Sequence, residues 1–517
     1  MIRPSKSRPV AARGLLVAAA VLLTSSSAFA ERRPLSDADA FVQETNAWAD
    51  ATLEALGVVP AFALAVVVDD EVVLAEGYGT ADRELGLAAD ADTQFYIASS
   101  TKPFTALLAA IHDARGTIAL DSPLAHHLDG AALAPELVPD QVRMRDLLTH
   151  TSGIDNGPIG FRVAYSGDHD PETLWALLPR STAMEEAPLG TYRYTNVGYN
   201  LYTMMLDRET GTRWQDQLQQ HLFAPLGLER TTAYVSRGEA HGWPSAAPYF
   251  GLDPNGIHRY SLQKKDNTMQ SAGGLLTTAR DAGRWLEFQL NHGRLDGRQL
   301  VDAEIVRRTH EKLVDASGPS LGFDQTGYGL GWSHGTHRER TVLSHGGGFA
   351  GFRSVLSFMP EAGIGVAVMV NESSAGTKLV SIAAHRAYDW WLGEELGEID
   401  AQVAGMAEKV DVFRERVRAD REKRGAREWQ LARPNAAYTG SFFNELYGTI
   451  TVEETGDGLS VRLGNLHCEG EAFTKPETMR VELVPGTGEV FSFLPVEGPV
   501  ETIHYDGEDF ARVPTEG

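Results

Sequence analysis

The residues Ser99-Ser100-Thr101-Lys102 carry more information about this chain than any other four. They stand between an aromatic and apolar run, Phe95–Ala98, and a helix-like run that ends at Gly116. Residues three apart lie on the same face of a helix, so Ser99 and Lys102 are predicted to lie one above the other. A serine hydroxyl becomes a nucleophile only with a base in hydrogen-bonding reach, and the lysine supplies one within a single helix. The helix N-terminus adds backbone N–H groups where an oxyanion would form.

The Ser-x-x-Lys pattern alone is weak, since a second copy, Ser261–Lys264, lies in a polar stretch with no predicted helix after it. The first copy, Ser99–Lys102, is supported by two candidate partners farther along the chain, Tyr194 and Asn196, which lie within a tyrosine-rich segment. A tyrosine near a lysine can be driven toward phenolate, and can then take the serine proton or deliver one to a leaving group. The Asn196 amide can hydrogen-bond a substrate carbonyl and the lysine amine. The alternative is a tyrosine-rich loop that only packs on the core.

A second partner motif, His345-Gly346-Gly347-Gly348, ends a predicted strand. Glycines on an edge strand let a substrate backbone approach closely. The N–H of Gly348 is a candidate second oxyanion donor beside the N–H of Ser99. The alternative is a glycine-rich hairpin with an incidental histidine.

In combination, Ser99-x-x-Lys102, Tyr194-x-Asn196 and His345-x-Gly347 resemble the motifs of serine hydrolases related to class C β-lactamases, D,D-carboxypeptidases and D-aminopeptidases. The similarity covers roughly residues 45–393 and includes four flanking blocks: Gly77–Asp82, Leu147–Gly153, Ala272–Asp281 and Tyr328–Trp332. The resemblance implies an α/β fold of the β-lactamase/transpeptidase type. In that fold an antiparallel sheet is flanked by helices, and the site lies in the cleft between the sheet and a helical lobe.

Carried onto this sequence, the resemblance makes Ser99 the acylated nucleophile, and Lys102 its neighbouring base or the cation that tunes the tyrosine. Tyr194 becomes the general base and then the acid, while Asn196 orients the substrate and the lysine. His345 stands where penicillin-recognising members carry the lysine of Lys-Thr-Gly. That lysine is a permanent cation suited to a carboxylate, whereas histidine is mostly neutral at about pH 7. Esters, amides and D-amino-acid peptides therefore join β-lactams as expected substrates.

The sequence thus predicts a serine hydrolase that forms an acyl-enzyme on an ester, amide or peptide bond and needs no metal or organic cofactor. The open alternative is a module that binds or senses cell-wall peptides or β-lactams with little turnover. His150 and Ser152 are expected to be structural, because their segment is typical of a turn. A rival α/β-hydrolase interpretation would make Ser320, within Gly318–Gly322, the nucleophile. It fails because that elbow needs a strand before the serine and a helix after it, and residues 303–313 are predicted to be helical.

The pattern of apolar residues predicts how the chain is organised. Residues 62–68 and 71–77 are predicted to form a strand hairpin and residues 340–371 further strands, with helices and loops between about 120 and 300. This order indicates one sheet built from N- and C-terminal pieces with an inserted helical lobe. The tail alternates as short strands and is similar to the lipocalin-like β-barrel that follows the hydrolase domain in some members. The predicted organisation is a signal peptide at 1–30, a hydrolase domain at 31–395, a helical linker at 396–432 and a small all-β, barrel-like domain at 433–517.

The N-terminus combines a basic start, a short apolar core, Leu15–Leu23, and a small-x-small site, Ala28-Phe29-Ala30. This pattern is typical of a secretory signal peptide, so we expect an extracytoplasmic protein, periplasmic or secreted, after cleavage near Ala30. The apolar core is too short to span a bilayer, and no stable membrane anchor is expected. The net charge of −24 argues against nucleic acid as a partner and leaves a small-molecule or peptide substrate. The lone Cys468 excludes an intramolecular disulfide, and the oligomeric state stays open.

Overall fold

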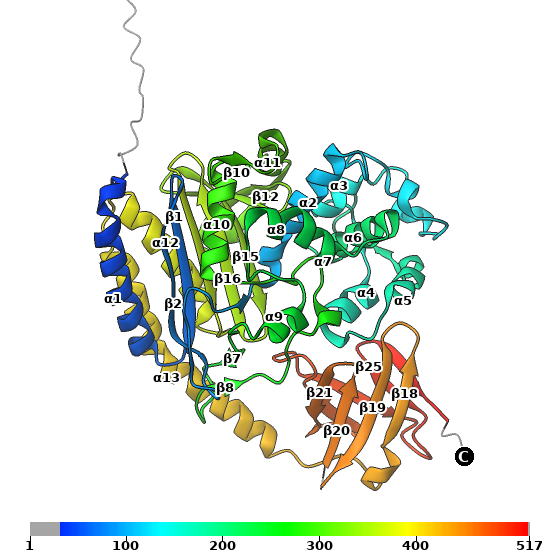
Figure 1. Cartoon of the computed structure of the whole chain (residues 1–517). Coiled ribbons are helices and arrows are strands. Elements are labelled where there is room, and N and C mark those ends of the chain that lie inside the picture. The colour runs from blue at the N-terminus through cyan, green and yellow to red at the C-terminus, as the bar shows by residue number, and fades with distance from the viewer. Residues whose placement is uncertain (1–31, 457, 515–517) are drawn as a thin grey trace, which may run out of the picture.

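The computed structural model describes residues 32–456 and 458–514, which form a large α/β domain and a small β domain joined by a long helix (Figure 1). The predicted signal peptide, residues 1–30, lies outside the described residues. Within the part that is described, no helix has the length and apolar character needed to cross a membrane.

One antiparallel sheet of nine strands forms the centre of the large domain, in the order β12-β13-β14-β15-β16-β17-β1-β2-β3. At its middle, β1 (Ala61–Val68) pairs with β17 (Ile364–Val370). The backbone N–H of Ala61 also donates to the side chain of Asn371, 310 residues away. β1 and β2 (Glu71–Asp82) form the predicted hairpin. The sheet is therefore assembled from both ends of the domain, as predicted. The other strands are β3 (Leu87–Ala88), β12 (Val314–Ser320), β13 (Phe323–Tyr328), β14 (Ser333–His337), β15 (Arg340–Phe349) and β16 (Phe352–Met359).

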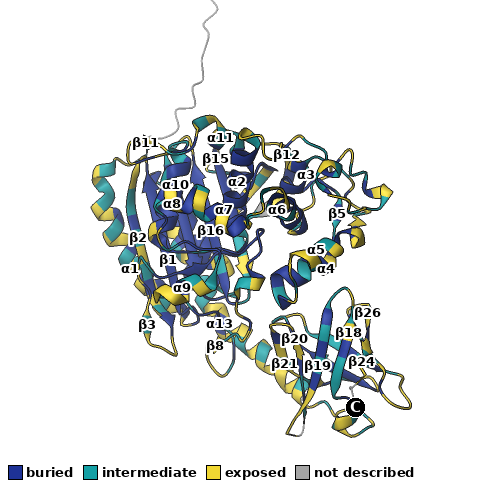
Figure 2. Cartoon of the chain, turned by 45° about the vertical axis from the view of Figure 1, so that its right-hand side comes forward, coloured by how far each residue is buried: buried dark blue, intermediate teal, exposed yellow. Residues whose placement is uncertain are grey.

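Every residue of β1 is buried, because helices cover both faces of the sheet (Figure 2). Successive residues of a strand point to opposite faces, so β1 contributes to two separate cores. Its larger side chains join a core with α1 (Ala38–Leu56) and α12 (Gly376–Trp391). Its alanines and Val67 join the core that contains α2 (Lys102–Ala114) and α10 (Ala279–Leu290). The sheet thereby fixes α2, which carries Lys102, against a rigid support.

A helical lobe separates the two halves of the sheet in sequence, as predicted. Its helices are short apart from α6, which follows Asn196: α3 (Met144–Leu148), α4 (Gly157–Phe161), α5 (Pro171–Ala176), α6 (Val197–Thr210), α7 (Trp214–Leu218), α8 (Ala224–Leu226) and α9 (Val235–His241). Two-residue strands pair within and beside the lobe: β4 (Phe95–Tyr96) with β9 (Leu276–Thr277), β5 (Ile154–Asp155) with β6 (Thr182–Ala183), and β7 (Tyr249–Phe250) with β8 (His258–Arg259). Farther along, β10 (Arg294–Leu295) pairs with β11 (Arg298–Gln299). Helix α11 covers only Ala303–Thr309 of the stretch expected to be helical.

The C-terminal domain is a nine-stranded antiparallel sheet that closes almost completely on itself, with strand order β21-β20-β19-β18-β26-β25-β24-β23-β22. Its two edge strands follow one another in the chain, separated only by Gly470. Helix α13 (Gly397–Gly425) leads to it and occupies most of the predicted linker (Figure 1). The strands are β18 (Gly440–Asn444), β19 (Gly448–Thr455), β20 (Gly458–Leu463), β21 (Leu466–Glu469), β22 (Glu471–Ala472), β23 (Thr478–Val481), β24 (Glu489–Leu494), β25 (Thr502–Tyr505) and β26 (Glu508–Arg512).

Hydrogen bonds dock the barrel on the helical lobe. The guanidinium of Arg162 donates to the carbonyl oxygens of Leu446 (2.6 Å) and Glu445 (3.1 Å). The backbone N–H of Asn465 donates to the carbonyl oxygen of Ser166 at 2.8 Å. Arg162 is only 4% exposed, so this contact is sealed from solvent. The barrel is therefore held to the helical lobe by the buried, charge-assisted hydrogen bonds of Arg162 and by a backbone hydrogen bond.

Candidate active site

Ser99 and Lys102 lie together at the start of α2. Ser99 belongs to a 3-10 turn, η2 (Ala98–Thr101), that runs directly into the helix, and Lys102 is the first residue of α2. The turn is tighter than the predicted α-helical turn, but it still places the lysine Nζ 3.1 Å from the serine Oγ. Ala98 enters the turn with φ of 45°, a left-handed conformation that costs a non-glycine residue energy.

Lys102 is fully buried, and its amine contacts three oxygens. Besides Ser99 Oγ, these are Oδ1 of Asn196 at 2.8 Å and the carbonyl oxygen of Ala272 at 2.7 Å. Burial lowers the pKa of the lysine well below its ordinary value, because the low-dielectric interior disfavours the charged form. The amide oxygen of Asn196 and the carbonyl oxygen of Ala272 can only accept hydrogen bonds. A neutral amine has two hydrogens for these two acceptors, so its lone pair is left for the serine hydroxyl.

Tyr194 lies over the same lysine, with Lys102 Nζ 4.8 Å from the centre of the ring. Burial raises the pKa of the phenol, and a hydrogen bond with the Ser99 hydroxyl partly opposes this effect. The residue as a whole is 43% exposed, so solvent reaches part of the tyrosine. Serine, lysine and tyrosine thus form one hydrogen-bonded cluster, with both ionisable groups shifted toward their neutral forms.

His150 holds the tyrosine segment in place. Its Nδ1 accepts the backbone N–H of Thr195 (3.3 Å), and its carbonyl oxygen accepts the N–H of Arg193 (2.8 Å). The imidazole lies 4.5 Å from the Tyr194 ring, and burial lowers its pKa well below the ordinary value. The expected turn is present, with φ of 61° at His150, but sequence reasoning missed that this turn forms the wall behind Tyr194. Tyr328, in contact with His150 at 4.8 Å between ring centres, completes that wall.

The glycine strand β15 lies directly against the segment that leads to Ser99. A Cβ on Gly347 would lie 1.9 Å from the carbonyl oxygen of Ile97, so only glycine permits this approach. Two buried hydroxyls fasten the contact: Ser354 Oγ donates to the Ile97 carbonyl at 2.7 Å, and Ser100 Oγ donates to the His345 carbonyl at 2.9 Å. These two hydrogen bonds fix the position of strand β15 relative to the turn that carries Ser99.

His345 presents a neutral acceptor rather than a cation. Its Nδ1 donates to the carbonyl oxygen of Gly346 at 2.8 Å, which leaves Nε2 as the acceptor. Nε2 is buried and has no hydrogen-bond partner among the described residues. Burial lowers the pKa of the imidazole to about 3. The ring centre lies 6.1 Å from that of Tyr194, so the unpaired acceptor belongs to the cluster.

The exposed Gly348 borders a hollow of about 430 Å³ between the two domains. Val484 and Pro485 of the barrel line the same hollow, together with Tyr260 and Arg353 of the large domain. The barrel therefore contributes to the surroundings of the glycine strand.

Two other serines in candidate motifs, Ser320 and Ser261, do not have the surroundings of a nucleophile. Ser320 ends β12, and β13 begins three residues later, so the segment is a strand hairpin rather than the strand–turn–helix of a nucleophile elbow. Ser261 is exposed, while Lys264 Nζ donates to the carbonyl oxygen of Ala164 at 2.6 Å and lies 3.7 Å over the ring of Phe349. Within residues 32–456 and 458–514, no group of three or more His, Cys, Asp or Glu side chains could hold a metal ion.

A serine, a lysine and a tyrosine gathered between an antiparallel sheet and a helical lobe define a serine hydrolase of the β-lactamase type. The family model described as Beta-lactamase matches residues 49–387, and the chain belongs to that family.

The chain is also similar to curated relatives, and its fold is similar to that of solved structures. The chain is 24% identical to an unguisins hydrolase, ungD, of Aspergillus violaceofuscus over 77% of this chain and 75% of the relative. It is 27% identical to penicillin-binding protein 4 of Amycolatopsis lactamdurans over 60% and 81%, respectively. The fold matches an octameric penicillin-binding protein homologue from Pyrococcus abyssi, with a TM-score of 0.56 and 20% identity, over 93% of this chain and 100% of that one. It also matches a D-amino acid amidase from Ochrobactrum anthropi, with a TM-score of 0.56 and 22% identity, over 67% and 98%.

Proposed function

We propose that this chain hydrolyses an ester, amide or peptide bond through an acyl-enzyme on Ser99. The observation that carries the proposal is the contact of 3.1 Å between the Ser99 hydroxyl and a buried lysine amine whose other two contacts are acceptors. The similarity to the curated unguisins hydrolase supports hydrolysis as the reaction class.

The proton path follows from the hydrogen-bond donors and acceptors. The neutral Lys102 amine takes the Ser99 proton as the serine oxygen bonds to the substrate carbonyl carbon. Tyr194 keeps its proton at rest, because burial raises the pKa of the phenol, and so can donate it to the leaving group as the scissile bond breaks. The lysine ammonium then gives its proton to the resulting phenolate, which restores the neutral amine and the phenol. Water completes the cycle by attacking the acyl carbon and passing a proton to the same pair, which delivers a proton to the departing Ser99 oxygen as the acyl bond breaks.

Backbone N–H groups of Ser99 and Gly348 are the proposed oxyanion donors. The support for this role is the tight contact of Gly347 with Ile97, which holds the glycine strand beside the serine turn. Donors fixed before the reaction stabilise developing charge without reorganising, and loss of one typically costs about 10²–10³ in rate.

The chemistry of His345 favours substrates that offer a hydrogen-bond donor at this position. Its Nε2 is a buried acceptor that has no partner in the part of the chain that the structure describes, and the ring is neutral, so a substrate N–H would satisfy it. A free carboxylate would meet no positive charge there. We therefore infer that amides and amino-acid derivatives are preferred over substrates, such as most β-lactams, that are recognised through a carboxylate.

A substrate panel and a covalent label test the proposal together. Nitrocefin, p-nitrophenyl butyrate and D-alanyl p-nitroanilide are compared under one condition, and a fluorophosphonate label is followed by intact mass. We expect the parent and Ser320→Ala to label and turn over alike, and Ser99→Ala to lose both. Labelling that survives in Ser99→Ala would contradict the proposal. A substrate-derived adduct that forms but does not decay would instead indicate the binding or sensing module.

A further inference from the structure

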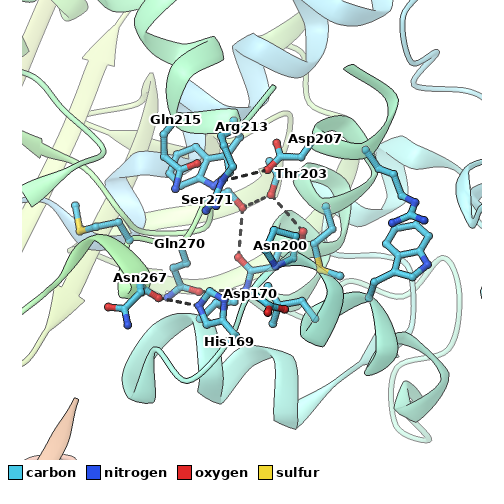
Figure 3. Close-up of a pocket in the computed structure, with 18 of the residues that line it drawn as sticks. His169, Asp170, Asn200, Thr203, Asp207, Arg213, Gln215, Asn267, Gln270 and Ser271 are labelled. Carbon is cyan, nitrogen blue, oxygen red and sulfur yellow. Dashed lines mark hydrogen bonds and ion pairs between the residues drawn. The ribbon is translucent and has the colours of Figure 1, made fainter. Parts of the chain in front are cut away.

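A second cavity, of about 570 Å³, lies along α6, the helix that follows Asn196 (Figure 3). Helices α5, α6 and α7 and the segment 266–271 surround it, and Ser99, Lys102 and Tyr194 are not among the residues that line it. Its volume is in the range of small-molecule sites, about 300–1,000 Å³. The cavity is therefore large enough for a ligand and distinct from the catalytic cluster.

Asp207, on α6, brings an incompletely paired carboxylate to this cavity. Its Oδ1 is enclosed and has no hydrogen-bond partner among the described residues, although 26% of the side chain is exposed. Its Oδ2 lies 4.0 Å from Nε of Arg213, which is beyond hydrogen-bonding distance. Burial raises the pKa of the carboxyl to about 7. The guanidinium of Arg213 and a hydrogen bond from the backbone N–H of Trp214 partly oppose this rise in pKa. Oδ1 still has no hydrogen-bond partner among the described residues, and an unpaired oxygen of a buried carboxylate is costly.

Gln215 supplies an independent observation at the same cavity. The residue is 2% exposed, and its Oε1 has no hydrogen-bond partner among the described residues. Figure 3 shows Gln215, Arg213 and Asp207 together at one end of the cavity. Buried side-chain oxygens are almost always satisfied, so two unsatisfied acceptors in one place indicate a missing group that carries N–H donors.

The rest of the lining favours a cation with an apolar body. The charged residues of the lining comprise four carboxylates and two arginines: Asp170, Glu172, Asp207, Asp266, Arg208 and Arg213. Trp175, Trp214 and Tyr234 add aromatic surface. The excess of negative charge disfavours an anionic ligand. Together, these features fit a primary ammonium group attached to an aromatic or aliphatic body.

Part of the cavity wall adjoins the partners of Lys102. Asn200 Oδ1 accepts a hydrogen bond from Ser271 Oγ at 3.3 Å, and both residues line the cavity. The residue after Ser271 is Ala272, whose carbonyl oxygen binds Lys102. Asn196, which also binds the lysine, lies one helical turn before Asn200 on the same segment. Two of the three contacts of the lysine are thus covalently continuous with the cavity wall.

We propose that this cavity is a second, non-catalytic site that binds a small molecule with a primary ammonium group, and that its occupancy changes the rate of hydrolysis. The ammonium donates to Asp207 Oδ1 and Gln215 Oε1, and the body of the ligand lies against the aromatic side chains. The occupant acts on catalysis through the wall formed by Asn200 and Ser271.

Titration calorimetry of the full-length parent with benzylamine at about pH 8 tests the binding site, because there the amine is protonated and Asp207 is mostly ionised. Benzyl alcohol, with the same ring and no charge, is the matched ligand control. We expect saturable binding of benzylamine and none of the alcohol. Asp207→Asn and, separately, Gln215→Leu should weaken binding by about tenfold to a hundredfold, the range for a lost hydrogen bond to a charged group. Thermal unfolding verifies that each variant is folded.

Glu172→Gln is the matched protein control, since this carboxylate also lines the cavity but its side chain is 80% exposed. Its loss should change the affinity by about threefold or less. Absence of saturable binding to the parent, or equal losses in Asp207→Asn and Glu172→Gln, would overturn the site. Calorimetry needs no turnover, so this outcome is independent of the acyl-enzyme proposal.

Steady-state kinetics test the effect on catalysis. Saturating benzylamine should change kcat of the parent by about fivefold or more, the scale of a typical coupling between sites, and should leave kcat of Asp207→Asn unchanged by the ligand. Binding by calorimetry with no change in the kinetics of the parent would overturn the regulatory role.

Discussion

Replacing Gly347 with alanine should disable acylation while leaving the chain folded. The new Cβ would lie 1.9 Å from the Ile97 carbonyl oxygen and 2.3 Å from Ser354 Oγ, whereas real Cβ contacts essentially never fall under 3.0 Å. The glycine strand must therefore retreat by about 1.1 Å from the backbone that leads to Ser99. A displacement of about 1 Å at a reacting centre can cost 10²-fold, and loss of an oxyanion donor about 10²–10³-fold. We expect kcat/KM to fall within that range.

Gly346→Ala, one residue earlier, is the matched control. Its Cβ would meet the end of the flexible Leu321 side chain at 2.7 Å, which can move without displacing the backbone. This variant should keep kcat/KM within about tenfold of the parent, since an overpacked but yielding site typically costs only about 1–3 kcal/mol of stability. The assay measures the rate of fluorophosphonate labelling and kcat/KM on the best substrate of the panel, with thermal unfolding to verify the fold. A folded Gly347→Ala protein that labels at the parent rate would refute the argument.

Four further substitutions test the site and the fold. Lys102→Met keeps the approximate length of the side chain but removes the proposed base, and should lower kcat/KM by about 10²–10⁴. In the parent, kcat/KM should fall as the pH drops through the lowered pKa of this lysine, because protonation occupies the lone pair; a flat acid limb in the pH–rate profile would count against that role. Tyr194→Phe should lower kcat/KM by about 10²–10⁴ and should slow an amide more than an activated ester, whose leaving group needs no proton; equal losses on both would argue against a general acid. Trp285→Ala removes a fully buried ring stacked 3.8 Å from Phe104 of α2 and should cost about 3–5 kcal/mol in urea unfolding, whereas a loss under about 1 kcal/mol would be inconsistent with this packing. Arg162→Met removes both hydrogen bonds to the barrel, about 1.5–3 kcal/mol each, and should speed limited proteolysis of the connecting helix; an unchanged cleavage rate would show that other contacts hold the barrel.

The fold was predictable where apolar residues are dense. Val66, Val67 and Val68 lie in a continuous apolar run, and so do the residues of β17, so the two central strands could be found and assigned to one sheet. The strands β12 to β14, at one end of the sheet, were missed, because a stretch such as Ser333–His337 is polar and becomes a strand by pairing with β13 and β15. Sequence propensity is overridden there by tertiary context.

The candidate site was predictable only at the level of side-chain types. Ser99, Lys102 and Tyr194 could be selected because their spacing and order match a known family. The contact of Lys102 with Ala272 could not be predicted, since every residue carries a carbonyl oxygen. The unpaired Nε2 of His345 was equally invisible, because a tautomer is set by the hydrogen bond of the other ring nitrogen.

The pairing of β1 with β17 has a consequence for biosynthesis. The ribosome releases β1 long before its central partner, since Ala61 and Asn371 are separated by 310 residues. Until the later strand emerges, one edge of the β1–β2 hairpin has no mate, and such an open edge is a template for aggregation. The nascent large domain therefore cannot complete its sheet, or the support beneath α2, until translation has passed Val370. The site would therefore form only late in synthesis. A chain truncated before Val370 would be inactive and, because of its open strand edge, prone to aggregate.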